Sequence, residues 1–422
     1  MIHNKFITLA KLLRNEYRPI DEIASHRDSQ LRRLVHHAYN NVPFYRERFD
    51  ATGVRPEDIQ TAEDLQLLPV IRKRELIDEE PHRIRDPSVP ATTLVERSTS
   101  GSSGVPFRFH VDKSYDQFCK AQFVRPYLSN GRKLFDTALT ISRHPPPPRK
   151  WFQRLGLLDN VVVPSHFAAE RMLSEYARLK PKVVSGYPSA ISVLANAISD
   201  SPDPHHLPKI VFTDSELLTP FVRDKLSQAF HAPVVDIYGT IETENIAWQC
   251  AHGSAYHYAA DCVILETLVD GRRTKPDEQG VLVCTVLNSL TMPFIRYEIG
   301  DLVTLSSQAC NCGRTLPLIS AIEGREMDQV VLPDGGRVSP MAFLELTSIL
   351  PGLAREYQII QESIDDFTVL VNLIRPLDEN ERRAIVEIGR TFNASARVQI
   401  ESVNCIPREP SGKRRAFISK VQ

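Results

Sequence analysis

Small and hydroxyl-bearing residues gather at positions 97–106, where the sequence reads Arg-Ser-Thr-Ser-Gly-Ser-Ser-Gly-Val-Pro. Such a composition favours neither helix nor strand. It suits an anion, because two glycines let backbone N–H groups approach a phosphate and the hydroxyls add rotatable donors. A flexible linker is the alternative. The strand-like alternation over 107–111 favours a hairpin-type phosphate cradle, whose candidate ligands are Ser98, Thr99, Ser100, Gly101, Ser102, Ser103 and Gly104.

A second group contains the residue types that bind zinc. Two cysteines stand in a Cys-Asn-Cys-Gly-Arg sequence at 310–314, and a cysteine and a histidine lie seven residues apart in the 250s. Four thiolate and imidazole ligands favour a tetrahedral zinc ion that joins loops and takes no part in catalysis. The alternative for each cysteine is a small buried apolar side chain. The predicted ligands are Cys250, His257, Cys310 and Cys312, with His252 or Cys262 as alternatives.

Three short apolar segments, at 182–189, 209–216 and 233–242, each end in polar or turn residues. Strand, polar end and helix in succession indicate a parallel α/β sheet. Because ligands of such sheets collect at the carboxyl ends of the strands, we expect one shared pocket. Its candidate residues are Tyr187, Ser215, Glu216, Tyr238, Gly239, Thr240 and Glu242.

The remaining elements divide the chain near residue 324. Residues 1–80 are predicted to be mostly helical, with Pro43 at the start of a helix. Short strands with Gly and Pro turns over 260–305 indicate antiparallel structure, with predicted strands at 262–266, 281–287 and 294–297. From Gly324 onward strands and helices alternate. The predicted fold class is therefore α/β, with a large domain at 1–323 and a small α+β domain at 324–422.

Composition excludes several classes of protein. The 422 residues carry 51 Lys plus Arg and 52 Asp plus Glu, a net charge of −1, which argues against a nucleic-acid partner. No apolar run is long enough for a membrane span, and the N-terminus lacks the pattern of a secretory signal. Seven scattered cysteines suggest reduced thiols or metal ligands. These features predict a cytoplasmic protein.

Six motifs in order, spread over nearly the whole chain, resemble those of the adenylate-forming superfamily of acyl- and aryl-CoA ligases. The resemblance is strongest to the phenylacetate–CoA ligase-like branch, which includes capsule-biosynthesis relatives and coenzyme F390 synthetases. The matching motifs are Asn41-Val42-Pro43-Phe44-Tyr45-Arg46, the loop at 98–106, Tyr238-Gly239-Thr240-Ile241-Glu242, Arg296-Tyr297-Glu298-Ile299-Gly300-Asp301, Gly324-Arg325-Glu326-Met327-Asp328 and Pro410-Ser411-Gly412-Lys413.

The resemblance implies a fold and a reaction. The large domain would contain parallel α/β sheets and a β-barrel-like subdomain, and the small domain would be mobile. A carboxylic acid would react with ATP, with Mg²⁺ present, to give an acyl-adenylate that passes to coenzyme A. Transfer to an amine or a hydroxyl is an alternative, and a non-catalytic nucleotide-binding protein is another. The family also implies a homodimer.

The resemblance assigns roles to individual residues. Glu242 would hold Mg²⁺, where the alternative is a glutamate at a helix start. Asp301 would accept hydrogen bonds from the ribose, where the alternative is a turn aspartate. Glu216 and Tyr238 would lie beside the adenine. Arg325 would reach the ribose or a phosphate.

Two assignments concern the small domain. Lys413 would support adenylate formation, where the alternative is a solvated basic tail. Asp328 would be the hinge between the half-reactions. One feature departs from the family: many relatives carry a lysine beside the proline of the phosphate loop, whereas this chain has Val105 and Phe107. Arg108 is the candidate replacement.

Overall fold

The computed structural model describes residues 2–99, 106–143, 148–201, 206–325, 329–338, 350, 353–390, 393–409 and 414–421. The chain forms two compact units, each built from separate stretches. Unit 1 comprises residues 1–130 and 238–322, and unit 2 comprises residues 131–237 and 323–422. One crossing between the units, at residue 323, lies beside the predicted domain boundary at 324, which remains a prediction.

Helices form the N-terminal part of unit 1, as predicted. They are α1 (Ile2–Asn15), α2 (Ile20–Asn41), α3 (Pro43–Thr52) and α4 (Lys73–Asp78), with 3-10 turns at Pro56–Asp58, Ala62–Leu67 and Ala91–Thr93. In α2 the residues at helical spacing, among them Leu31, Leu34, Val35 and Ala38, are buried. Pro43 occupies the first turn of α3, where the missing N–H costs no hydrogen bond.

A hairpin and a helix follow in unit 1. Strands β1 (Val95–Ser98) and β2 (Arg108–Val111) pair antiparallel on either side of the glycine–serine loop. Helix α5 (Lys113–Ser129) begins at Asp112, whose carboxylate accepts hydrogen bonds from the amides of Ser114 and Tyr115. The predicted strand that leads out of the loop is therefore confirmed.

The rest of unit 1 is a sheet with mainly antiparallel pairing, in the order β11-β10-β12-β13-β14-β9-β8. One predicted strand, 294–297, is wrong except for its last residue. Strand β13 begins only at Tyr297, because Arg296 has a φ of +50° and turns its side chain inward. The strands are β8 (Glu244–Cys250), β9 (Gly253–Tyr258), β10 (Val263–Val269), β11 (Arg272–Arg273), β12 (Gln279–Val286), β13 (Tyr297–Leu305) and β14 (Leu318–Arg325).

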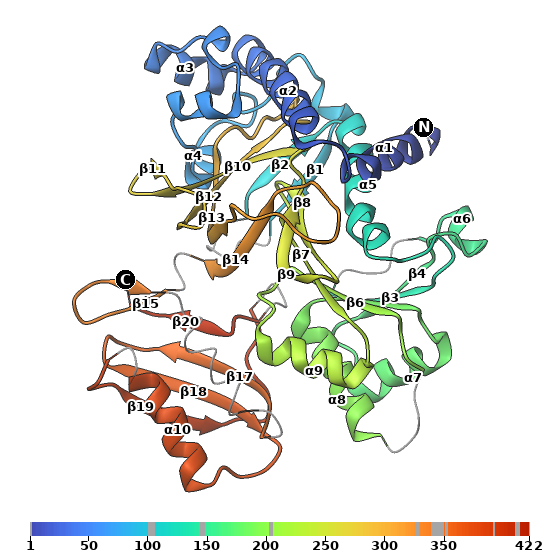
Figure 1. Cartoon of the computed structure of the whole chain (residues 1–422), viewed down its shortest axis with the longest axis vertical. Helices are drawn as coiled ribbons and strands as arrows, with labels where there is room; N and C mark the ends of the chain where they lie inside the picture. Colours follow the sequence, from blue (N-terminus) through green and yellow to red (C-terminus); the bar gives the residue numbers. More distant parts are fainter. Residues whose placement is uncertain are drawn as a thin grey trace. The chain divides into compact units, whose positions relative to one another are not determined.

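Unit 2 begins with the predicted parallel sheet, in the order β4-β3-β5-β6-β7, and each neighbouring pair is parallel. Its strands are apolar and β-branched, as expected when helices cover a sheet (Figure 1). The elements are β3 (Ala138–Ser142), α6 (Trp151–Arg154), β4 (Asn160–Pro164), α7 (Ala169–Leu179), β5 (Val183–Gly186), α8 (Pro188–Asp200), β6 (Ile210–Asp214), α9 (Pro220–Phe230) and β7 (Val234–Thr240).

The C-terminal part of unit 2 is α+β, as predicted. A mixed sheet in the order β19-β18-β17-β20 carries helix α10 against it (Figure 1). Its buried side chains, such as Tyr357 and Phe417, belong to the same apolar cluster as those of α8 and α9. The elements are β15 (Val330–Val331), β16 (Arg337–Val338), β17 (Ala354–Gln361), β18 (Asp366–Leu373), α10 (Glu379–Arg390), β19 (Arg397–Ser402) and β20 (Phe417–Ser419).

Among the described helices, none has both the length and the apolar character needed to cross a membrane.

Candidate active site

The two ends of the glycine–serine loop are tied together in unit 1. Thr99 donates its backbone N–H to the carbonyl of Phe107 at 3.0 Å, and the amide of Phe107 donates to Thr99 Oγ1 at 3.0 Å. Ser98 ends β1 just before this bridge. The predicted ligands Ser100, Gly101, Ser102, Ser103 and Gly104 lie outside the described residues. The loop therefore has a closed base, with Thr99 buried within it.

A lysine that sequence reasoning missed lies at this base. Lys73, the first residue of α4, donates from Nζ to Thr99 Oγ1 at 3.1 Å and forms an ion pair with Glu242 Oε1 at 3.3 Å. Arg108, the predicted replacement for the absent loop lysine, is instead 73% exposed and lies 3.9 Å from Glu96. Nothing in the sequence around Lys73 marks it, because its partners are 26 and 169 residues away and only the fold brings them close.

Glu242 is held in a tight turn between β7 and β8. The hydroxyls of Thr240 and Thr243 hydrogen-bond across this turn at 3.0 Å, and the Glu242 side chain is buried. No helix begins here, so the alternative of a helix-start glutamate is wrong. A Cβ at Gly239 would lie 1.9 Å from the carbonyl oxygen of Glu244, which explains why the turn requires glycine at this position.

The two central motifs are joined by a reciprocal pair of hydrogen bonds. The hydroxyl of Tyr238 donates to Asp301 Oδ2 at 2.5 Å, and the hydroxyl of Tyr297 donates to Glu242 Oε1 at 3.1 Å. Each motif thus contains a tyrosine hydroxyl that donates a hydrogen bond to a carboxylate of the other motif. The structure brings together four residues that the sequence placed about 60 positions apart.

The side chain of Arg296 holds the motif at 296–301 in place. Its guanidinium forms two hydrogen bonds of 3.1 Å with the carboxylate of Glu266 and one with the carbonyl of Leu68. All of these groups are buried, and this forked geometry fixes the start of β13. The conspicuous arginine of the motif is therefore a support for its neighbours Tyr297 and Asp301.

Unit 2 carries the other predicted nucleotide ligands. Glu216 accepts hydrogen bonds from the amide and the hydroxyl of Ser189, both at 2.9 Å, and from the amide of Arg414 at 2.9 Å. Burial raises the pKa of Glu216, although these hydrogen bonds oppose the rise. Ser215 is exposed, has a φ of +68° and donates its hydroxyl to Asp214. Arg325 is exposed at the end of β14.

Glu216 also contacts the C-terminal tail of unit 2 through the amide of Arg414. Arg414 directly follows Lys413, the predicted catalytic lysine, which lies outside the described residues together with Asp328, the predicted hinge. Tyr187 immediately precedes the first turn of α8, which contains Ser189. The predicted shared pocket thus divides into a group in unit 1, around Glu242 and Asp301, and a group in unit 2, around Glu216.

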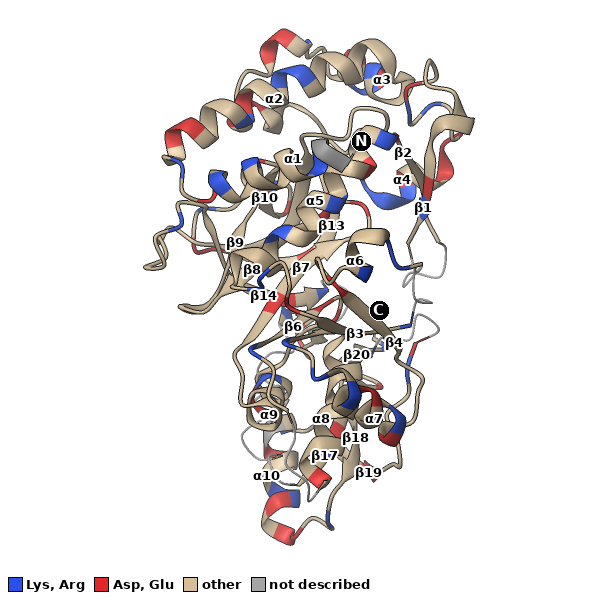
Figure 2. Ribbon diagram, turned by 90° about the vertical axis from the view of Figure 1, so that its right-hand side faces the viewer, with Lys and Arg blue, Asp and Glu red and all other residues tan. Residues whose placement is uncertain are grey.

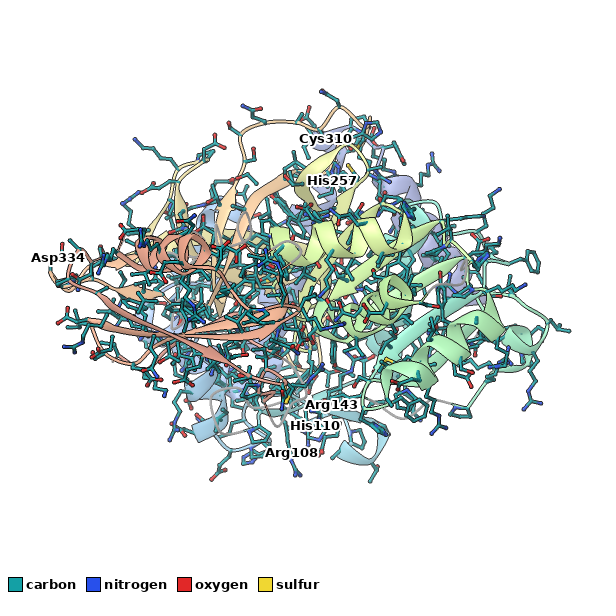
Figure 3. All side chains as sticks on the ribbon, turned by 90° about the horizontal axis from the view of Figure 1, so that it is seen from below. Arg108, His110, Arg143, His257, Cys310 and Asp334 are labelled. Carbon is teal, nitrogen blue, oxygen red and sulfur yellow. The ribbon has the colours of Figure 1, made fainter. Side chains whose placement is uncertain are left out.

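The predicted cysteine and histidine ligands meet in unit 1. The ligating atoms of Cys250, His257, Cys310 and Cys312 all lie within 4.8 Å of one another, and Figure 3 shows His257 and Cys310 close together. The sulfurs of Cys250 and Cys310 are 3.7 Å apart, and Cys312 Sγ is 3.3 Å from His257 Nε2. Around a tetrahedral zinc the ligand atoms are separated by about 3.5 Å.

The orientation and the protonation of the His257 ring suit metal binding. His257 Nδ1 lies 3.3 Å from the carbonyl oxygen of Leu316, so a proton on Nδ1 leaves the Nε2 lone pair facing Cys312. Burial lowers the pKa of His257, which favours the neutral imidazole that coordinates metals. The alternative ligands are not part of this cluster, since Cys262 hydrogen-bonds Asp261 and His252 is exposed outside it.

Comparisons with known proteins agree with this architecture. Residues 330–420 match the family model of the CapK C-terminal domain. The phenylacetate-coenzyme A ligase of Thermus thermophilus is 26% identical over 382 residues, which cover 85% of this chain and 83% of the relative. Protein CapK of Staphylococcus aureus is 24% identical over 344 residues, which cover 78% of this chain and 75% of the relative.

The fold itself matches solved structures. A crystal structure of 2-hydroxyisobutyryl-CoA ligase with the adenylate of its acid superposes with a TM-score of 0.81, at 21% identity, over 96% of this chain and 91% of that chain. These matches agree with one another and with the order of the motifs in the sequence. They also agree with the hydrogen bonds that join two of the motifs in the structure. The chain is therefore similar to proteins of the adenylate-forming superfamily, in particular to those of its phenylacetate–CoA ligase-like branch.

Proposed function

We propose that this protein is an ATP-dependent acid–CoA ligase. A carboxylate oxygen of the acid attacks the α-phosphorus of ATP, so that pyrophosphate leaves and an acyl-adenylate forms. The thiol of coenzyme A then attacks the acyl carbon, and AMP leaves. The observation that carries the proposal is the cluster at the loop base, where the buried carboxylate of Glu242 lies 3.3 Å from Lys73, which also binds Thr99.

The proposal gives the residues of unit 1 these roles. Backbone amides and hydroxyls of Ser98–Gly104 hold the β- and γ-phosphates, and Lys73 adds a positive charge at the base of the loop. Asp301, oriented by Tyr238, accepts hydrogen bonds from the ribose. Glu242 would hold Mg²⁺, a hard cation that prefers carboxylate oxygens and would offset the charge of the phosphates.

In unit 2, Ser215 and Glu216 bind the nucleotide, as do Gly239 and Thr240 in unit 1. Arg325 binds a phosphate or the ribose. Lys413 promotes adenylate formation, because a compact ammonium on a long stem offsets the repulsion between the acid and the α-phosphate. The small domain turns about Asp328 between the two half-reactions. The hydrogen bond between Glu216 and the Arg414 amide supports a tail that carries Lys413 to the nucleotide.

Two acceptors are consistent with the comparisons. Coenzyme A is favoured by the phenylacetate-coenzyme A ligases of Thermus thermophilus and Pseudomonas putida, each 26% identical to this chain. An amine or hydroxyl acceptor is the second candidate. It rests on the resemblance to capsule-biosynthesis relatives, with which the similarity to protein CapK and the match of residues 330–420 to the CapK C-terminal domain agree.

We also propose that Cys250, His257, Cys310 and Cys312 hold a structural zinc ion. The distances between the ligand atoms and the orientation of the His257 ring support this assignment. All four positions of a tetrahedral ion would be filled by protein, so it would stabilise loops and leave no site for substrate. A cytoplasmic location fits the seven cysteines, none of which forms a disulfide among the described residues. A homodimer remains an expectation from the family.

Pyrophosphate exchange tests the proposal. The wild-type chain is incubated with ATP, labelled pyrophosphate and a panel of aryl and acyl acids, and we expect exchange that depends on one class of acid. Coenzyme A, amines and alcohols are then compared as acceptors. Lys413→Ala should lose exchange by at least roughly a hundredfold and should still convert a supplied acyl-adenylate to thioester.

The control for this experiment is Lys420→Ala, which removes an exposed lysine of the same tail that pairs with Glu362. It should leave exchange unchanged. Equal exchange by Lys413→Ala and the wild type would overturn the role of Lys413. Failure of every acid to support exchange, with ATP binding retained, would favour the non-catalytic nucleotide-binding alternative.

A further inference from the structure

We propose that unit 2 carries a docking surface for anionic membranes, formed by the segments 132–136 and 149–155. The inference does not depend on the adenylation chemistry, because these residues lie outside the groups assigned to it. The surface has two components, exposed apolar side chains and basic side chains that form no ion pair with a carboxylate in the described part of the chain. Its members are Lys133, Leu134, Phe135, Lys150, Trp151, Arg154 and Leu155.

The two segments form one continuous surface. The amide of Leu158 donates to the carbonyl of Leu134 at 2.6 Å, and the Arg132 guanidinium donates to the carbonyl of Asp159 at 2.9 Å. The first segment leads into β3 and the second connects β3 to β4, with α6 within it (Figure 1). Leu158 and Asp159 follow the second segment closely, and a Cβ at Gly156 would lie 3.9 Å from Phe135 Cδ1, so the two segments lie next to each other.

The apolar side chains project into solvent. Phe135 is 73% exposed, Leu155 71% and Trp151 63%, and Leu134 is also exposed. Such exposure means that these side chains stand out from the surface. Single exposed apolar residues are common, but a group of four that contains Trp and Phe marks an interaction site.

The charge of the same segments is strongly positive. Residues 131–136 and 148–160 contain five basic side chains and two acidic ones. Both acids are already engaged, since Asp136 pairs with Lys209 at 3.0 Å and Asp159 with Arg149 at 2.5 Å. Basic residues lie in and beside α6 (Figure 2). Among the described residues no carboxylate pairs with the side chains of Lys133, Lys150 or Arg154.

The combination of exposed aromatic and basic side chains indicates which kind of partner binds this surface. Trp and Phe belong at the boundary between headgroups and acyl chains, and Lys and Arg beside them attract anionic lipids. A protein partner that buries such side chains would fit a groove or a flat face, whereas these side chains stand out from the surface. The occupant that fits a protruding basic and aromatic surface is an anionic bilayer, bound at its face, in agreement with the lack of a membrane-spanning helix among the described residues.

The two tryptophans allow a direct test. Trp151 is exposed, whereas Trp248 is fully buried in unit 1, so a change in tryptophan emission reports Trp151. With vesicles of phosphatidylcholine and phosphatidylglycerol at low salt, we expect co-flotation of the protein and a blue shift of the emission. Vesicles of phosphatidylcholine alone should give neither. Binding should weaken as salt is raised, because exposed charges are screened.

Variants separate the two components. Lys133→Gln, Lys150→Gln and Arg154→Gln combined should lower the partition coefficient roughly a hundredfold, at about fivefold for each charge. Trp151→Phe should still float with the vesicles but should lose the emission shift. The matched control combines Ile374→Ser and Arg382→Gln, an exposed apolar and an exposed basic residue of the C-terminal part.

The control should bind as the wild type does. Absence of flotation of the wild type at low salt would overturn the proposal, and so would equal binding by the charge variant. Acid-dependent pyrophosphate exchange of the charge variant should match the wild type. This separates failure of the membrane surface from failure of the proposed enzyme activity.

Discussion

The contacts of Lys73 could not be predicted from the sequence and are seen only in the folded chain. The chain lacks a lysine next to the proline of the phosphate loop, yet Lys73 places an ammonium on Thr99 at the base of that loop and 3.3 Å from Glu242. A positive charge here offsets the repulsion between a carboxylate and a polyphosphate. We therefore propose that Lys73, which lies 26 residues before Thr99, takes the place of the missing loop lysine.

Replacing Lys73 tests this interpretation. We expect Lys73→Met to raise the KM for ATP and to lower the rate of pyrophosphate exchange at least roughly tenfold, because both contacts are lost. Lys73→Arg should keep part of the activity. The matched control is Arg74→Met, since Arg74 is the next residue of α4, is 74% exposed and pairs with Asp78. Normal kinetics of Lys73→Met would show that the ion pair is only structural.

At the scale of elements, the C-terminal sheet is joined to the parallel part of unit 2 through α9. Phe221 of α9 packs edge-on against Tyr357 of β17, with ring centroids 5.6 Å apart. On the same helix, Lys225 donates from Nζ to the carbonyl of Arg355. Burial lowers the pKa of Lys225 to about 8, which Glu356 only partly opposes. The contact between these elements therefore contains a cation that is poorly solvated.

The lowered pKa of Lys225 predicts how stability depends on pH. Between about pH 8 and pH 10.5 the unfolded chain holds the Lys225 proton and the folded chain releases it, so this group makes the free energy of unfolding rise with pH. Lys225→Met should remove this rise and should stabilise the protein at pH 7 by about 1–3 kcal/mol. Urea unfolding at several pH values measures both effects. The exposed Lys182→Met is the control, and an unchanged pH slope in Lys225→Met would contradict the prediction.

At the scale of the whole chain, unit 1 is assembled from two stretches separated by more than a hundred residues, and buried charges join them. Glu16 accepts hydrogen bonds from Arg125 at 3.0 Å and from Arg314 at 2.8 Å. Burial alone would raise the pKa of Asp261, but the guanidinium of Arg125, 2.9 Å away, holds it below the ordinary value. Arg314 lies two residues after Cys312, so the proposed zinc cluster is part of the same junction.

Removal of the metal should therefore weaken the whole of unit 1. We expect protein purified without chelator to contain one zinc ion per chain and chelation to lower the Tm by at least roughly 5 °C. Cys312→Ser should reproduce this loss, whereas Cys405→Ser, at an exposed cysteine outside the cluster, should not. A zinc-free preparation with an unchanged Tm would remove the assignment.

Local sequence determined much of this protein. Apolar strands that end in polar residues gave the parallel sheet because strand and helix periods are local properties, and the predicted zinc ligands followed from residue type. Conversely, the strand expected at 294–297 begins only at Tyr297. Phe294 and Ile295 are buried but belong to no strand, since the Phe294 carbonyl accepts the Val286 amide and the Ile295 amide donates to the Tyr45 hydroxyl, and Arg296 turns toward Glu266. A buried ion pair with a partner 30 residues away overrides local strand propensity at that point.

The sequence alone determined the family, the order of the motifs and the residue types available for phosphate, ribose and metal. Only the tertiary structure decided which of these residues touch. The ion pair of Lys73 with Glu242 and the tyrosine hydrogen bonds between the two central motifs depend on contacts across long sequence separations. The periodicity of the sequence does not predict such contacts, because they arise when separate elements pack together and exclude water.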